Sequence, residues 1–217
     1  AIRDLHPTGM TFVGGNFMAA FGNPFANHLT HSPFSPAPAV DTQVFGVVLD
    51  IEPAREMGND VLFFGGVFPA TYSSGHAVVF DNIGKLDATG LSLNAGNADG
   101  PVWDLERNPP SLTSWPVSVV AIGGFDDLSG SASRGMAWFG DDGSGTPSWW
   151  PLGSGLGIAG TGKASAFVVR SPGNAQVQVL VEETCLMIGG TFTSLDGVLA
   201  DSIGEYCCDP FAVQLPL

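Results

Sequence analysis

The chain has 217 residues, of which 44% are hydrophobic and 13% are charged, and it contains 30 glycines and 16 prolines. Its 7 basic and 21 acidic residues give a formal net charge of −14 at pH 7, which argues against nucleic acid or an anionic membrane surface as a partner. No apolar run approaches the roughly 18 residues that span a membrane as a helix, so membrane insertion is not expected. Few charges and many turn-forming residues instead predict short strands in an all-β fold.

One pattern occurs four times along the chain: an apolar run, two glycines and an aromatic residue. The four copies occupy residues 10–17, 61–68, 119–125 and 185–192. Self-similarity on this scale is the signature of a repeat architecture. A glycine at the end of a strand permits a positive φ and a close backbone approach, so each pair is expected to mark a bulge or a tight corner.

Each copy is followed by a loop rich in small and polar residues and then by a second predicted strand. These second strands cover residues 27–32, 76–81, 134–140 and 201–207, and further strands are predicted at 44–51, 101–107, 165–171 and 176–183. Roughly four strands for each glycine pair is typical of β-propeller blades. We therefore expect a single all-β, β-propeller-like domain over residues 1–217, with four-stranded blades at about 1–41, 42–98, 99–160 and 161–217. The blades form either a closed ring or part of a larger one.

The three cysteines are Cys185, Cys207 and Cys208. Cys185 leads into the fourth glycine pair, and Cys207 ends the strand predicted after it. Adjacent strands of one hairpin would bring these two residues within disulfide reach. Cys208 would then be a free thiol or bonded to another chain. The chain begins at Ala1 rather than Met, which indicates a processed secretory product or an excised fragment.

The third repeat carries the most detailed pattern after its glycine pair. The positions that define it are Gly123, Gly124, Gly130, Met136, Trp138, Asp142, Gly143, Trp149 or Trp150, Leu152, Gly153, Gly155 and Leu156. The fourth repeat follows the same pattern over residues 189–197 and at Ile203 and Tyr206, whereas the third places Phe125 directly after its glycines. This pattern resembles the kelch-like GG-x-F repeats of surface β-propellers, including the fungal cortical cell-polarity marker family and similar bacterial extracellular proteins. The resemblance implies an extracellular or cell-surface propeller whose motif residues form blades rather than catalyse a reaction.

Two acidic residues in the third repeat are candidate metal ligands. Asp141 and Asp142 begin the segment DDGSG, which offers carboxylate oxygens in a turn, as a calcium site does. Asp-Gly is also the commonest turn pair, so turn chemistry alone accounts for the segment equally well. No cofactor is expected, and calcium is the one alternative.

Two adjacent tryptophans, Trp149 and Trp150, are candidate contacts for a ligand or partner. Neighbouring residues of a strand point to opposite faces of a sheet, so one of the two is predicted to face solvent. An exposed indole there would contact carbohydrate or protein. The alternative is that both indoles pack between blades.

The preferred function is a non-catalytic extracellular or surface scaffold that binds a protein partner or assembles with copies of itself. The first alternative is a carbohydrate-binding, lectin-like propeller. The second is a glycoside hydrolase, in which two of the 21 acidic residues converge in the loops as a catalytic pair.

Overall fold

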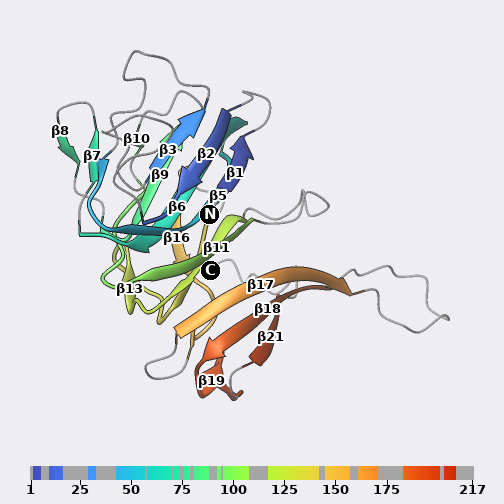
Figure 1. Ribbon diagram of the computed structural model, residues 1–217. Helices are drawn as coiled ribbons and strands as arrows, with labels where there is room; N and C mark the ends of the chain where they lie inside the picture. Colours follow the sequence, from blue (N-terminus) through green and yellow to red (C-terminus); the bar gives the residue numbers. More distant parts are fainter. Residues whose placement is uncertain are drawn as a thin grey trace.

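The computed structural model describes residues 2–5, 10–16, 29–32, 43–56, 58–69, 71–73, 76–78, 81–87, 92–93, 95–107, 117–141, 145–156, 161–170, 183–200 and 203–208. These residues form strands, turns and bends and no helix (Figure 1), so the predicted all-β class is confirmed. Within these ranges, no helix is long and apolar enough to cross a membrane.

Four antiparallel sheets follow one another along the chain, and a strand of each contains at least the first glycine of one pair. The first sheet consists of β1 (Ile2–Leu5), β2 (Met10–Gly14) and β3 (Leu29–Ser32) in the order β1-β2-β3. The second has the order β10-β9-β6-β5, with β5 (Val47–Glu56), β6 (Asn59–Val67), β9 (Ile83–Asp87) and β10 (Ser92–Leu93). The third has the order β11-β12-β15-β16, with β11 (Val102–Arg107), β12 (Val117–Gly123), β15 (Met136–Gly140) and β16 (Ser148–Pro151). The fourth has the order β17-β18-β21, with β17 (Thr161–Arg170), β18 (Glu183–Thr191) and β21 (Ile203–Cys208).

Smaller elements lie beside these sheets. A three-stranded sheet consists of β4 (Gln43–Val44), β7 (Thr71–Ser73) and β8 (His76–Val78). One hairpin pairs β13 (Asp127–Leu128) with β14 (Ser131–Ala132), and another pairs β19 (Ser194–Leu195) with β20 (Val198–Leu199). In the described part of the chain, two of the main sheets have four strands, two have three, and the sheets do not close into a ring.

Most of the predicted strands are found, but one sheet partner is wrong. The prediction placed the second strand of the second repeat at 76–81, whereas β9, which begins at Ile83, pairs with β6. Asn82 has a positive φ of 62°, which changes the direction of the chain. The strand that joins the sheet, β9, therefore begins at the next residue, Ile83. The strand predicted at 176–183 lies largely outside the described residues.

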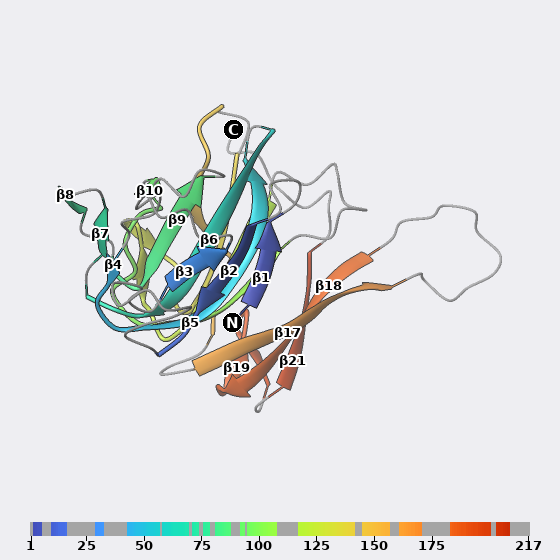
Figure 2. The same ribbon diagram turned by 45° about the horizontal axis from the view of Figure 1, so that its top comes forward.

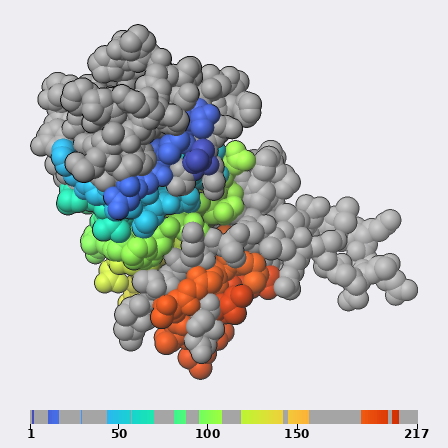
Figure 3. Space-filling view, in the orientation of Figure 1, coloured from blue at the N-terminus to red at the C-terminus, as the bar shows by residue number. Residues whose placement is uncertain are grey.

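The four sheets lie beside one another in chain order, as the successive colour bands of Figure 3 show, and the apolar cores place their faces against one another. Three separate apolar cores fill the boundaries between them. We call the side of a sheet that faces the next sheet its forward side and the opposite side its back side. Both sides of the third sheet are buried, because Ala121 lies in the core with the second sheet and Val120 in the core with the fourth. This explains the unbroken apolar run before the third glycine pair.

The two glycines of the second pair are required for two different close approaches, and the first of these approaches is also found at Gly14. A Cβ on Gly14 would lie 2.5 Å from Val48 Cγ1, and one on Gly65 would lie 2.6 Å from Val102 Cγ1, so the first glycine admits a valine of the next sheet. A Cβ on Gly66 would collide with the carbonyl oxygen of Val47, in the neighbouring strand of the same sheet.

The predicted bulge is present opposite the glycine pairs of the second and third sheets. The register shifts between Val48 and Asp50, opposite Gly66 and Gly65, and again between Val102 and Asp104. Gly123 is the structural counterpart of Gly66, since a Cβ there would meet the carbonyl oxygen of Pro101. Ile122 therefore takes the place of the first glycine, which explains why Phe125 follows the third pair directly.

Candidate functional site

The four sheets carry an apolar residue at one equivalent position on their forward sides. Leu29 lies opposite Gly14, Ile83 opposite Gly65, Met136 opposite Ile122, and Ile203 opposite Gly189. The first three side chains are at most 3% exposed, because each packs into the core shared with the next sheet, whereas Ile203 is 66% exposed. The forward side of the fourth sheet is therefore uncovered at this position.

The glycine opposite Ile203, Gly189, is also more exposed than its counterparts in the first two sheets. Gly14 and Gly65 are buried beneath side chains of the following sheet, and Gly189 is partly exposed. Figures 1 and 2 show the fourth sheet at one end of the molecule, with β19 beside it. The position at which an incoming side chain would contact this glycine is thus open at that end.

The β19–β20 hairpin adds two more exposed apolar side chains. Val198 is 69% exposed and Leu199 is 90% exposed, whereas the corresponding hairpin β13–β14 has Ser131 and Ala132 in its second strand. Positive φ at Asp196 and at Gly197 gives the turn the geometry of a type I′ hairpin. Val198 and Leu199 are neighbours in β20, so they point to opposite faces of the hairpin. We therefore refer to the uncovered forward side of the fourth sheet at Ile203 and Gly189 as the terminal apolar surface.

The β19–β20 hairpin beside this surface is fixed to the third sheet. Leu195 is buried in the core between the third and fourth sheets and forms a β-bridge with Leu156. The Asp196 carboxylate accepts a hydrogen bond from the Ser154 N–H at 2.7 Å, and the Asp196 N–H donates to the Gly155 carbonyl at 2.9 Å. These contacts anchor the hairpin, and with it Val198 and Leu199, to the third sheet.

The loop carboxylates with resolved contacts hold backbone turns. Asp99 Oδ1 accepts from the N–H groups of Asp126 and Asp127 at 2.9 and 3.0 Å, and Asp127 Oδ1 accepts from Gly130 at 2.7 Å. Asp141, one of the two predicted calcium ligands, accepts from the Gly145 N–H at 2.9 Å. The other, Asp142, lies outside the described residues. Within those residues no three His, Cys, Asp or Glu side chains come together as a metal site.

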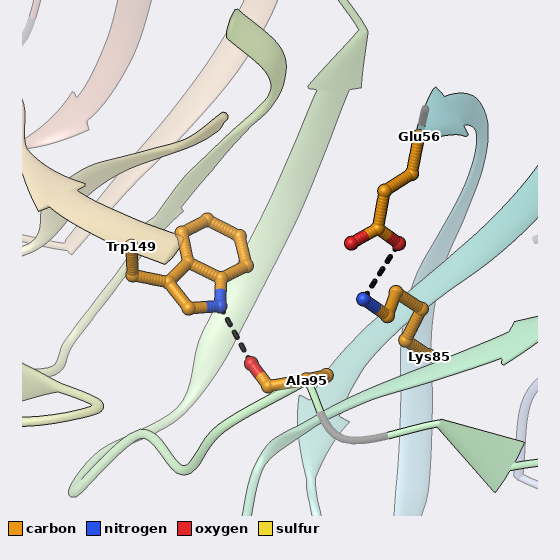
Figure 4. Close-up of polar contacts among 4 residues, drawn as sticks. All are labelled: Glu56, Lys85, Ala95 and Trp149. Carbon is orange, nitrogen blue, oxygen red and sulfur yellow. Dashed lines mark hydrogen bonds and ion pairs between the residues drawn. The ribbon is translucent and has the colours of Figure 1, made fainter. Parts of the chain in front are cut away.

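The two adjacent tryptophans occupy opposite faces of β16, as strand alternation predicts. Trp149 is only 5% exposed, and its indole N–H donates to the Ala95 carbonyl at 2.6 Å (Figure 4). Its ring makes edge contacts with Phe63 and Phe139, so it is part of the core between the second and third sheets. The prediction of a ligand contact therefore narrows to Trp150, which is partly buried and stacks on Trp138 at a centroid distance of 6.1 Å.

The backbone register brings two of the cysteines together. Cys185 of β18 lies directly opposite Cys207 of β21, and Cys208 lies opposite Thr184. Directly opposed Cα atoms in antiparallel strands are about 4.5–5.5 Å apart, which is within the range that a disulfide spans. The disulfide between Cys185 and Cys207 stays a prediction that this register allows.

A buried ion pair at the boundary of the second and third sheets was not expected from the sequence. Lys85 Nζ lies 2.7 Å from Glu56 Oε2 (Figure 4) and 4.8 Å from the ring centroid of Phe139. Only 6% of the lysine side chain is exposed. The ammonium group is enclosed by protein and is a structural element rather than a binding group.

Comparison with known proteins gives no relative. No protein-family model, no curated protein and no solved structure matches this chain. The site must therefore be interpreted from its own geometry, and its most distinctive feature is the terminal apolar surface.

Proposed function

We propose that the protein is a non-catalytic scaffold of the β-propeller type that acts outside the cell or on its surface by binding protein. The observation that carries this proposal is the terminal apolar surface. Single exposed apolar residues are common on proteins, but Ile203 is exposed at a position that is buried in every preceding sheet, which is the mark of an interaction site.

The arrangement of the first strands supports a propeller-like architecture. β1 contacts β5, β5 contacts β11, and β11 contacts β17, so the first strands of successive sheets lie side by side. In propellers the blades are arranged radially around a central channel. A radial series of this kind leaves one free face at each end until a further sheet covers it.

The polar groups of the described loops support a binding role rather than a catalytic one. The carboxylates of Asp99, Asp127, Asp141 and Asp196 accept hydrogen bonds from backbone N–H groups. Carboxylates used in this way fix the loops and hairpin turns beside the sheets, which is a structural role.

A photo-reactive amino acid at position 203 tests this proposal. The variant is expressed in the cells that make the protein and is irradiated there, and its adducts are identified by mass spectrometry. We expect adducts with protein from position 203 and few from position 67, where Val67 is 44% exposed but belongs to the second sheet. Equal labelling from both positions, or no adduct at all, would contradict the proposal.

Carbohydrate binding is a second candidate, favoured by the Trp138–Trp150 pair. The two rings stack and part of Trp150 is exposed, although its indole N–H is itself buried and has no hydrogen-bond partner among the described residues. A glycan array tests it: binding should appear with the native chain and fall at least tenfold with Trp150→Ala. A native chain that binds no glycan would exclude this candidate.

A further inference from the structure

We infer that the terminal apolar surface binds the back side of the first sheet in a second copy of this chain, so that copies join head to tail. The inference rests on the proposed scaffold function and names its partner. The outer sides of the first and fourth sheets match the two sides of the three boundaries between neighbouring sheets.

The back side of the first sheet has an apolar residue that lacks its usual cover. Ile51 lies opposite Phe64 in the second sheet, Leu105 opposite Ala121 in the third, and Ile2 opposite Val13 in the first. Ile51 and Leu105 are at most 1% exposed, whereas Ile2 is 64% exposed. The position that packs on the preceding sheet in the second and third sheets is therefore uncovered in the first sheet.

Inside the molecule, these back-side residues contact the glycines of the preceding sheet. A Cβ on Gly14 would lie 3.3 Å from Ile51 Cγ2, and one on Gly65 would lie 3.5 Å from Leu105 Cδ1. Gly189 is the partly exposed glycine at the equivalent place in the fourth sheet. Ile2 of a second copy has the shape and position to contact it.

The two free ends are thus complementary halves of a boundary that the molecule already forms internally. One end supplies Gly189 and Ile203, and the other supplies Ile2. A contact that joins different surfaces of identical chains is heterologous, so it closes into a ring or extends as an open chain. Two copies would contribute twice the four main sheets of one chain, which lies at the upper end of the blade numbers seen in propellers.

The net charge distinguishes association by apolar contact from association by ion pairs. Each copy carries −14, so two copies repel one another, and salt screens this repulsion over a Debye length of about 8 Å at physiological ionic strength. Association driven by apolar contact should therefore strengthen as sodium chloride is raised. Association driven by ion pairs would weaken.

Sedimentation velocity with purified Ile2→Glu and Ile203→Glu variants tests the inference. The native chain should associate as concentration and salt rise, and each variant alone should remain monomeric. An equimolar mixture of the two variants should form a dimer and stop there, because one intact end remains on each chain. The exposed-site control Val67→Glu should associate as the native chain does, and far-UV circular dichroism should show that all variants are folded.

Several outcomes would overturn the inference. These are a native chain that stays monomeric at all concentrations, a single variant that still associates, or a mixture that remains monomeric. The photo-crosslinking at position 203 separates this failure from failure of the scaffold function. Adducts with a different protein would leave the scaffold function standing and overturn the head-to-tail contact, whereas adducts with residues 2–5 or 10–16 of a second copy would support both.

Discussion

The Asp50 carboxylate accepts a hydrogen bond from the backbone N–H of Leu105 at 3.0 Å, across the boundary between the second and third sheets. Asp50 is buried and stands at the bulge of β5. Asp104 occupies the same place at the bulge of β11 and is also buried. A buried aspartate at the bulge therefore occurs in both the second and the third sheet. In the second sheet, the Asp50 carboxylate fixes the position of β11, the first strand of the third sheet.

Replacement of Asp50 by alanine should lower the free energy of unfolding by about 1–3 kcal/mol, because the buried N–H of Leu105 loses its acceptor. Urea denaturation measures this change. Asp126→Ala is the control, since Asp126 is exposed and a surface change of this kind shifts stability by less than about 0.5 kcal/mol. Equal effects of the two substitutions would show that the Asp50 hydrogen bond contributes nothing specific.

A methyl group on Gly65 should also destabilise the protein. Gly65→Ala would place its Cβ 2.6 Å from Val102 Cγ1, and overpacking of this kind costs about 1–3 kcal/mol. Gly124→Ala is the matched control within a glycine pair, because its nearest neighbour would be 3.4 Å away. The double variant Gly65→Ala/Val102→Ala should recover part of the loss. A thermal melt in which Gly65→Ala matches the native chain would contradict this account of the first glycine.

The sequence was sufficient to predict the all-β class and the bulge beside the second and third glycine pairs, because both depend on local composition. The expected positive φ is not found at any described glycine of the four pairs, whose need for glycine comes from close approaches instead. The buried aspartates were missed, although the sequence contained a signal for them. Residues 48–52 and 102–106 share the pattern Val-x-Asp-(Ile or Leu)-Glu. A comparison of the segments before each glycine pair would have found this second repeat.

The exposure of the candidate residues could not be predicted, because it depends on neighbours distant in the sequence. Ile83 and Ile203 hold equivalent positions in their strands, but the third sheet covers Ile83, and no sheet among the described residues covers Ile203. Trp149 is buried because Ala95, in the second sheet's loop, supplies a carbonyl acceptor. No pattern within the third repeat contains that information.

Breaking the ion pair between Lys85 and Glu56 should destabilise the protein. Lys85→Met leaves the Glu56 carboxylate without its cation. Breaking a buried pair costs about 3–5 kcal/mol, and we expect the low end of this range because 17% of the Glu56 side chain is exposed. The double variant Lys85→Met/Glu56→Gln should recover most of the loss in urea denaturation. Arg55→Met is the control, since its pair with Asp60 is at the surface and such pairs contribute at most about 1 kcal/mol.

Removal of calcium should leave stability unchanged if Asp141 serves the turn alone. Its Oδ1 already accepts the Gly145 N–H, which is the local hydrogen bond that an aspartate turn needs. We therefore expect equal melting temperatures in excess calcium and in a chelator. An increase of several degrees with calcium, abolished by Asp141→Ala, would instead establish the metal site.

The disulfide prediction can be resolved at the level of single cysteines. Because Cys185 lies opposite Cys207 and not opposite Cys208, the Cys208→Ser variant should keep one disulfide and have no free thiol when it is unfolded without reductant. Cys207→Ser should lose that bond, and reduction of the native chain should lower the free energy of unfolding by about 2–4 kcal/mol. Thiol titration and mass spectrometry of an unreduced digest measure both. Three free thiols in the native chain, purified without reductant, would show that the opposed cysteines do not bond.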